Sequence, residues 1–295
     1  MFSFYNKRWI FIAVSVVVML AGLVSYLVSG LNVDIDFKGG TSIVFNTKSD
    51  SATKEEIADL VKATVETTGS VVVQPSMDNP QEYTIKLNSL TTEESDKLVN
   101  ALISKYVPEE KEYNDYAISS FTAAYGKQLA GDAIFALIIA VILMLVYITF
   151  RFEFLQGVSA VIALIHDVLI MLSIYALFRV PVNSSFIAVI LTIIGYSINN
   201  TIVVFDRVRE NRKFARKETT AQIVDKSLKE TLGRSINTTI TTLIMVVCLY
   251  IIGGNSIKEF ALPLMIGLVG GAYSSLFIVA PIWAMLKGEK KKASK

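Results

Sequence analysis

Two adjacent amide side chains, Asn199 and Asn200, lie in a strongly apolar stretch that we expect to be a lipid-embedded helix. An amide buried in hydrocarbon costs several kcal/mol unless another group satisfies it. Polar groups at such depth therefore face partner helices or a water path, and they often mark function. At three- and four-residue steps, the stripe that contains the pair is Thr192, Tyr196, Asn199, Asn200, Val203 and Asp206.

The preceding apolar run carries His166 and Asp167 near its middle. A charged Asp at the bilayer centre costs about 2.5–3.5 kcal/mol on insertion scales, so Asp167 is expected to be neutral, paired or hydrated. His166 is the only histidine of the chain, and an imidazole titrates close to physiological pH. Two interpretations stay open: a proton relay, and a neutral hydrogen bond between packed helices.

The following apolar run repeats the polar spacing. Its polar residues, at three- and four-residue steps, are Arg234, Asn237, Thr238 and Thr241. Because neighbouring runs cross the bilayer in opposite directions, Arg234 and Asn200 are expected at similar depth. Arg234 either pairs with Asn200 or extends to the headgroups as one more interfacial charge.

Other kinds of chemistry have little support in the sequence. With one His, one Cys and neither an HExxH nor a GxSxG motif, the chain is expected to hold no metal or cofactor and to be no enzyme. Cys248 has no second cysteine with which to form an intrachain disulfide. The basic residues follow membrane topology and lack interleaved aromatic residues beyond Phe214, which argues against nucleic-acid binding.

Six long apolar runs must position these residues. The hydrophobic fraction is 53%, and each run is close to the ~20 residues that span a bilayer as a helix. The runs are about 9–28, 133–150, 154–178, 185–205, 236–252 and 260–286. The first is longer than the ~7–15-residue core of a signal peptide and no clear cleavage site follows, so we expect a retained helix. In the last, Gly267 and Gly271 have GxxxG spacing, which favours close helix packing. The sequence predicts a polytopic α-helical membrane protein with six transmembrane helices.

Charge in the loops predicts the topology. Lys and Arg in short loops favour the cytoplasmic side. They gather before the first run, between the second and third, between the fourth and fifth, and in the tail, so both termini are expected in the cytoplasm. The opposite short loops carry only Arg179 and Lys258. Residues 31–130, with sixteen acidic and nine basic residues, are then extracytoplasmic.

Residues 31–130 have the pattern of a folded domain. Strands are expected at 41–45, 71–74, 83–87 and 117–121, and helices at 54–67, with Thr53 as N-cap, and at about 91–106. Residues 75–80 are expected to form the turn region between the second and third strands. The order β-α-β-β-α-β is that of an α+β ferredoxin-like domain. Such a fold serves many functions and by itself identifies none.

The expected organisation has six parts. They are a tail and first helix (1–30), the extracytoplasmic α+β domain (31–130), the second to fourth helices (131–205), a basic cytoplasmic segment (206–233), the fifth and sixth helices (234–286) and a basic tail (287–295). In the basic segment, Ile223, Val224, Leu228 and Leu232 recur at helical spacing between charges. This pattern predicts an amphipathic helix that lies on the membrane surface.

Five motifs in series resemble the SecF family of protein-translocase subunits. The first, IDFKGGT at 35–41, resembles the family's IDFxGG signature and contains Asp36, Phe37, Gly39 and Gly40. The others are RFE at 151–153 with ALIHDV at 163–168, GYSINNTIVVFDR at 195–207, Arg234 with TTITTL at 238–243, and the glycine pair at 253–254. The match covers nearly the whole chain in order and spacing.

The resemblance implies one pseudo-symmetric half of a protein of the resistance–nodulation–division superfamily in the bacterial cytoplasmic membrane. The implied partners are SecD as the other half, the SecYEG translocon, a preprotein substrate, YajC and membrane lipid. The implied function is assistance of preprotein export on the outer side, driven by the proton or sodium motive force. The family associates ion coupling with a carboxylate in its GYSxND motif and an arginine of the next helix, which fall on Asn200 and Arg234. The full expected polar site is Asn199, Asn200, Arg234, Asp167, His166, Asp206, Thr238 and Thr241.

At position 200 the sequence departs from the family pattern, which has Asp there. Asn is nearly isosteric with protonated Asp, but it does not take up or release a proton at working pH. Three explanations stay open: an introduced substitution that fixes the neutral-carboxyl state, coupling through Asp167 with His166 or through a carboxylate of SecD, or an uncoupled or differently coupled lineage.

Two further functions compete with preprotein export. One is half of a small-molecule or lipid exporter of the same superfamily, against which the single compact outer domain argues. The other is a purely structural assembly subunit, for which a carboxylate at position 200 would change nothing.

Overall fold

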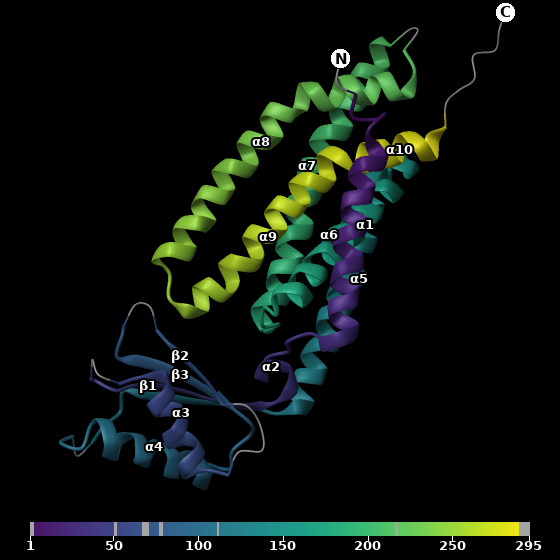
Figure 1. Cartoon of the computed structure of the whole chain (residues 1–295). Coiled ribbons are helices and arrows are strands. Elements are labelled where there is room, and N and C mark those ends of the chain that lie inside the picture. Colours follow the sequence, from purple (N-terminus) through teal and green to yellow (C-terminus); the bar gives the residue numbers. More distant parts are fainter. Residues whose placement is uncertain are drawn as a thin grey trace, which may run out of the picture. The chain divides into compact units, whose positions relative to one another are not determined.

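The computed structural model describes residues 3–49, 52–66, 71–76, 79–110, 112–215 and 218–288 (Figure 1). The chain divides into two compact units. The helical unit comprises residues 1–32, 134–251 and 259–295, and the sheet unit comprises residues 33–133 and 252–258.

The sheet unit is a four-stranded antiparallel sheet with helices. Its strands are β1 (Gly40–Asn46), β2 (Val72–Pro75), β3 (Glu82–Leu87) and β4 (Tyr116–Phe121), in the spatial order β2-β3-β1-β4. The short helix α2 (Ile35–Lys38) precedes β1, and α3 (Lys54–Thr64) and α4 (Thr92–Tyr106) follow β1 and β3. These elements fall within a few residues of the expected ones, because alternating apolar residues and helix caps identify them in the sequence.

Alternation along the two central strands builds the core of the sheet unit. Ile43 of β1 lies opposite Ile85 of β3, and both are fully buried. Ile57 of α3 and Leu98 of α4 belong to the same apolar cluster. The Thr53 hydroxyl accepts a hydrogen bond from the first turn of α3, as expected from the sequence. The end expected for this helix, at residue 67, and part of the 75–80 turn region (77–78) lie outside the described residues.

The helical unit contains helices long and apolar enough to cross a membrane, and the described part of the chain has six such spans. The first five are α1 (Arg8–Ser29), α5 (Ala123–Arg151), α6 (Phe154–Phe178), α7 (Ser184–Phe214) and α8 (Thr220–Ile252). The sixth span, Ile257–Lys287, contains most of α9 (Asn255–Phe277) and all of α10 (Val279–Lys287). The first ten or so residues of α5 belong to the sheet unit.

The basic segment 206–233 differs from the expected surface helix. Residues 206–214 continue α7, and residues 220–233 form the first turns of α8. Apolar side chains that were expected to lie on lipid, such as Val224 and Leu228, are instead buried in the core of the helical unit. Val208 of α7 belongs to the same core. A polar link between the two helices supports this arrangement, because Asn211 Nδ2 of α7 donates to Ser227 Oγ of α8 at 3.0 Å. The basic residues 216–217 and the tail from 289 onward lie outside the described residues.

Glycines allow close helix contacts at two places in the helical unit. A Cβ on Gly22 of α1 would lie 2.3 Å from Ser173 Cβ and 2.4 Å from Ser173 Cα of α6. A Cβ on Gly267 of α9 would lie 1.7 Å from Ile193 Cδ1 of α7, and Gly271 likewise faces Ser197. Small residues at these positions therefore let α1 approach α6 and let α9 approach α7. The GxxxG spacing of Gly267 and Gly271 predicted close packing of α9, whereas the contact through Gly22 was not predicted.

We expect Gly22→Ala to lower the free energy of unfolding by about 1–3 kcal/mol, because the added methyl group meets the α6 backbone and overpacks the contact. Gly270→Ala on α9 is the matched control, since a Cβ there has no neighbour within 4 Å. The measurement is a denaturant titration of both variants in detergent. Equal stabilities of the two variants would show that α1 does not pack on α6 through Gly22.

Candidate functional site

Asp167 of α6 is the centre of a buried polar cluster shared by four helices. Only 2% of this residue is exposed. Its Oδ2 accepts hydrogen bonds from Ser197 Oγ of α7 at 2.6 Å and from Ser274 Oγ of α9 at 2.9 Å. Its Oδ1 lies 3.0 Å from His166 Nδ1, and His166 Nε2 lies 2.8 Å from Ser15 Oγ of α1. We call these five residues the polar centre.

Ser15 has a second hydrogen-bond partner, the Phe11 carbonyl at 3.3 Å. In one arrangement of the protons, the Ser15 hydroxyl donates to this carbonyl and Ser15 Oγ accepts from His166 Nε2–H. His166 Nδ1 then either accepts from a protonated Asp167 carboxyl or donates to the Asp167 carboxylate. In both arrangements one proton lies between the two groups, and the pair carries no net charge.

Loss of that shared proton is unfavourable in a buried site. It would leave the Asp167 carboxylate charged and uncompensated, with two hydrogen-bond acceptors 3.0 Å apart. A buried charge without a partner is strongly destabilising, so proton release requires water, another charge or a movement of the surrounding helices. The polar centre therefore joins α6 to α1, α7 and α9 through the hydrogen bonds of one buried carboxyl and one imidazole.

Asn200 and Asn199 lie on different sides of α7. Asn200, one turn after Ser197, is 2% exposed, and its Nδ2 has no hydrogen-bond partner among the described residues. Asn199 is exposed. Consecutive helical residues are about 100° apart, so the expected single stripe divides into a buried side with Asn200 and an open side with Asn199. A buried amide donor without a partner is uncommon and costly, and it singles out Asn200.

The expected α8 residues do not contact Asn200 in this conformation. The Arg234 side chain is exposed, and among the described residues it forms no hydrogen bond or ion pair with Asn200. The Thr238 hydroxyl donates to the Arg234 carbonyl at 2.9 Å, and the Thr241 hydroxyl donates to the Asn237 carbonyl at 3.0 Å. Both threonines thus bond to the backbone of their own helix.

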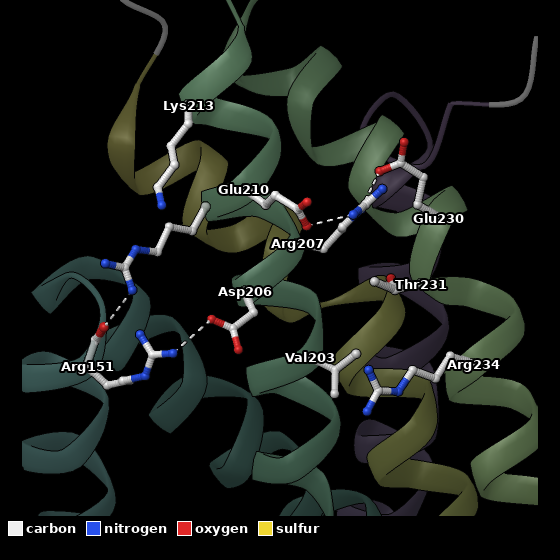
Figure 2. A pocket seen from close by; sticks show the side chains of 10 residues that line it. Arg151, Val203, Asp206, Arg207, Glu210, Lys213, Glu230, Thr231 and Arg234 are labelled. Carbon is white, nitrogen blue, oxygen red and sulfur yellow. Dashed lines mark hydrogen bonds and ion pairs between the residues drawn. The ribbon is translucent and has the colours of Figure 1, made fainter.

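Asp206 and Arg234 lie together in a separate charged pocket of about 500 Å³, which we call the end pocket (Figure 2). Asp206 Oδ1 is 3.6 Å from Arg151 Nη2 at the last residue of α5. Figure 2 shows the Arg234 guanidinium on the opposite side of Val203 from Asp206. Five of the predicted site residues therefore fall into two groups: Asp167 and His166 in the polar centre with Asn200 one turn along α7 from Ser197, and Asp206 and Arg234 in the end pocket. The other three, Asn199, Thr238 and Thr241, belong to neither group.

Several members of the site were not predicted as such. None of Ser15, Ser197 and Ser274 was assigned to the polar site from the sequence. Serines in apolar helices commonly bond to their own backbone, as Ser159 does to the Leu155 carbonyl at 2.7 Å, so the residue type alone gives a weak signal.

A further contact missed from the sequence joins α7 to α8. The Tyr196 hydroxyl donates to Thr239 Oγ1 at 2.8 Å. Tyr196 lay on the predicted stripe of α7, but its partner Thr239 was not assigned to the site. The bond is the direct polar contact between these helices nearest in sequence to Asn199 and Asn200.

The IDFKGGT motif packs within the sheet unit. Asp36 and Phe37 lie in α2, and Gly39 adopts a φ of 82°, which favours glycine. A Cβ on Gly40 would lie 2.5 Å from the Leu87 carbonyl oxygen, and a Cβ on Gly126 of α5 would lie 2.4 Å from the Phe37 carbonyl oxygen. The motif thus brings α2, β3 and the start of α5 into close contact.

Glu153, in the turn between α5 and α6, accepts hydrogen bonds from Lys287 Nζ at 2.6 Å and from Arg212 Nη1. Burial acts to raise the pKa of this carboxyl, but the hydrogen bonds and charges of Lys287 and Arg212 outweigh it and hold the pKa below its ordinary value. A lowered pKa in the folded state stabilises the fold above the unfolded pKa, and that contribution is lost as pH falls through the folded pKa.

We therefore expect Glu153→Gln to reduce the free energy of unfolding at pH 7 by no more than about 1 kcal/mol, because solvent screens the partly exposed carboxylate. The difference from the parent chain should vanish as the pH falls below the ordinary glutamate range. Denaturant titrations in detergent across that range measure it, with Glu109→Gln as the exposed control. A difference that stays constant with pH would exclude an ionic contribution of Glu153.

Comparison with known proteins gives consistent matches along the chain. Residues 99–289 match the family model for the C-terminal part of the protein export membrane proteins SecD and SecF. The protein translocase subunit SecF of Alicyclobacillus acidocaldarius is 37% identical over 97% of this chain and 92% of its own length. The protein translocase subunit SecDF of Bacillus subtilis is also 37% identical, over 98% of this chain and 39% of its own length.

A solved structure agrees with these sequence matches. The crystal structure of SecDF from Thermus thermophilus, a translocon-associated membrane protein, has a TM-score of 0.82 and 30% sequence identity to this chain. The match covers 97% of this chain and 38% of the SecDF chain. This chain therefore spans about two fifths of that solved protein.

Proposed function

We propose that this chain, which belongs to the SecD/SecF family of protein export membrane proteins, acts as the SecF subunit of a protein translocase and assists preprotein export across the bacterial cytoplasmic membrane. The observation that supports this most directly is the match to SecF over nearly the full length of both chains. The chain is a multi-pass membrane protein, in keeping with its six candidate spans. No covalent catalysis is part of the proposed activity.

The proposed partner is SecD, which would supply the remainder of a SecDF-like assembly. Polar side chains at the surface of the helical unit support this. Asn199 of α7 and Asn237 of α8 are exposed, and their side chains have no hydrogen-bond partner among the described residues. Exposed amides are unfavourable against lipid, so a second set of helices with polar groups is expected to cover this face. SecYEG, YajC and the preprotein are proposed as further partners.

The proposed orientation places both termini in the cytoplasm and residues 31–130 outside, because the basic residues gather at one end of the spans. We assign the sheet unit to the ferredoxin-like type. The chain order β1-α3-β2-β3-α4-β4 and the antiparallel sheet order β2-β3-β1-β4 support that assignment. This domain would contact the emerging preprotein or move with it.

The proposed energy source is an ion gradient acting through the polar centre. Asp167 and His166 lie within hydrogen-bond distance of each other, and their other partners lie on α1, α7 and α9, so a change in the protons of this pair would change contacts between helices. A single charge moved through 100 mV supplies ~2.3 kcal/mol, enough to shift a conformational equilibrium of a few kcal/mol. Asn200 and Arg234 are proposed as the second part of the coupling site.

Co-purification tests the proposed function. The full chain, tagged and solubilised under mild conditions, is expected to recover SecD and SecYEG. Recovery of a periplasmic adaptor with an outer-membrane channel, and no translocon, would contradict the proposal in favour of a small-molecule or lipid exporter. A cell in which this chain is depleted should accumulate unprocessed preproteins, and normal export in such a cell would contradict the proposal independently.

A further inference from the structure

The end pocket is rich in charge for a cavity between membrane-spanning helices. It lies where α5 ends and where the charged parts of α7 and α8 pack together (Figure 2). All of its lining belongs to the helical unit. Three carboxylates and five cations line it: Asp206, Glu210 and Glu230, against Arg151, Arg207, Arg209, Lys213 and Arg234.

All three carboxylates of the end pocket are already paired. Arg207 binds both Glu210 and Glu230, with nitrogen–oxygen distances of 2.6 and 2.7 Å (Figure 2). Asp206 pairs with Arg151. Two of the five cations therefore pair with the three carboxylates, and five cations less three carboxylates leave the pocket a formal net charge of +2. The other three cations hold no carboxylate of the described residues, so an anionic ligand could bind them without displacing one.

The remaining cations have no carboxylate partner among the described residues. Arg209 donates to the Arg151 carbonyl at 3.4 Å, and Lys213 and Arg234 form no ion pair within the described part of the chain. Arg209 and Lys213 are four residues apart on α7, so two like charges share one helix face, which is destabilising unless an anion lies between them. Figure 2 shows the Lys213 side chain pointing into the pocket from α7.

Exposed apolar side chains lie at the level of the pocket along α5 and α8. Phe150, next to Arg151 on α5, is 89% exposed, and Ile236, two residues after Arg234 on α8, is 42% exposed. Both belong to candidate membrane spans. A ligand that fits both features has an anionic head beside the pocket cations and hydrocarbon along the exposed apolar side chains of α5 and α8. A guanidinium and an ammonium together suit a phosphate group, since Arg offers a planar fork of donors and Lys a compact charge.

We propose that the end pocket binds the phosphate headgroup of an anionic phospholipid, held chiefly by Arg209 and Lys213, with the acyl chains beside α5 and α8. The bound headgroup relieves the repulsion between the two α7 cations and links the end of α5 to the packed ends of α7 and α8. Free phosphate presents the same head chemistry without the hydrocarbon, so the two sources are separable by experiment.

Native mass spectrometry tests this proposal. The full chain is released from nanodiscs that contain equal amounts of phosphatidylglycerol and phosphatidylcholine, and the lipids that it retains are counted. The parent chain should retain phosphatidylglycerol in preference to phosphatidylcholine. The double variant R209Q/K213Q should lose this preference roughly 30-fold, since each cation near a headgroup contributes about a factor of five.

The matched control is K226Q/K229Q, which removes the same charge from the first turns of α8 outside the pocket. This control should keep the preference for phosphatidylglycerol. The variant R209K/K213R retains both positive charges and should keep the preference too, so it provides a second test in case R209Q/K213Q folds poorly. Equal losses in R209Q/K213Q and K226Q/K229Q would overturn the proposal, because they indicate diffuse attraction to a basic surface. Displacement of phosphatidylglycerol by millimolar inorganic phosphate would overturn the lipid assignment.

Discussion

Asp167→Asn should abolish gradient-dependent preprotein export by the reconstituted complex with SecD. The amide keeps the shape of the side chain and still accepts hydrogen bonds from Ser197 and Ser274, but it does not exchange a proton. One charge moved through 100 mV supplies ~2.3 kcal/mol, which shifts a conformational equilibrium constant by roughly 40-fold. Asp167→Asn removes this shift. The measurement is preprotein movement into vesicles with and without an imposed proton gradient.

Two control variants separate ion coupling from a structural role of Asp167. Asp132→Asn removes an exposed carboxylate of α5 and should leave gradient-dependent export intact. Ser197→Ala removes one hydrogen bond to Asp167 but keeps the carboxyl, so it should weaken export only slightly. Full gradient-dependent export by Asp167→Asn would refute the proposed role of the polar centre. Equal loss in Asp167→Asn and Ser197→Ala would indicate that the cluster only packs the helices.

The sequence predicted the sheet unit well because its signals are local. The alternation of apolar and polar residues identified β1 and β3, whose residues are alternately more and less buried, and the Thr53 cap marked the start of α3. These signals arise from a solvated surface opposite an apolar core, a contrast that a water-exposed domain provides.

The polar site in the helices was predicted only in part. Asp167 and His166 stood out because charged residues are rare in apolar runs, but their partners on α1, α7 and α9 did not. Lipid and protein interior are about equally apolar, so composition does not show which side of a membrane helix faces its neighbours. For the same reason the stripe at three- and four-residue steps did not separate Asn199 from Asn200. Arg234 has the spacing of a partner for Asn200, but its long side chain extends instead into the end pocket.

A carboxyl at position 200 is the single substitution that we expect to increase gradient-dependent export most. We expect Asn200→Asp to increase proton-gradient-dependent export several-fold, provided that coupling through this position adds to coupling through Asp167. Asn200 is buried and its Nδ2 has no hydrogen-bond partner among the described residues, so a carboxyl of the same size breaks no hydrogen bond of that nitrogen and introduces a group that exchanges a proton. Because the shapes of the two side chains match, assembly with SecD should be unchanged.

The matched control for this change is Asn199→Asp, which adds a carboxylate one residue away on the exposed side of α7. If coupling depends on a carboxyl buried beside the polar centre, Asn200→Asp gains gradient dependence and Asn199→Asp does not. Adding Asp167→Asn to the Asn200→Asp chain then shows whether the two positions act in one path, since a single path predicts that export loses its gradient dependence again. Full gradient-dependent export by the chain with Asn200, unchanged by Asn200→Asp, would mean that position 200 carries no coupling and that the polar centre acts without it.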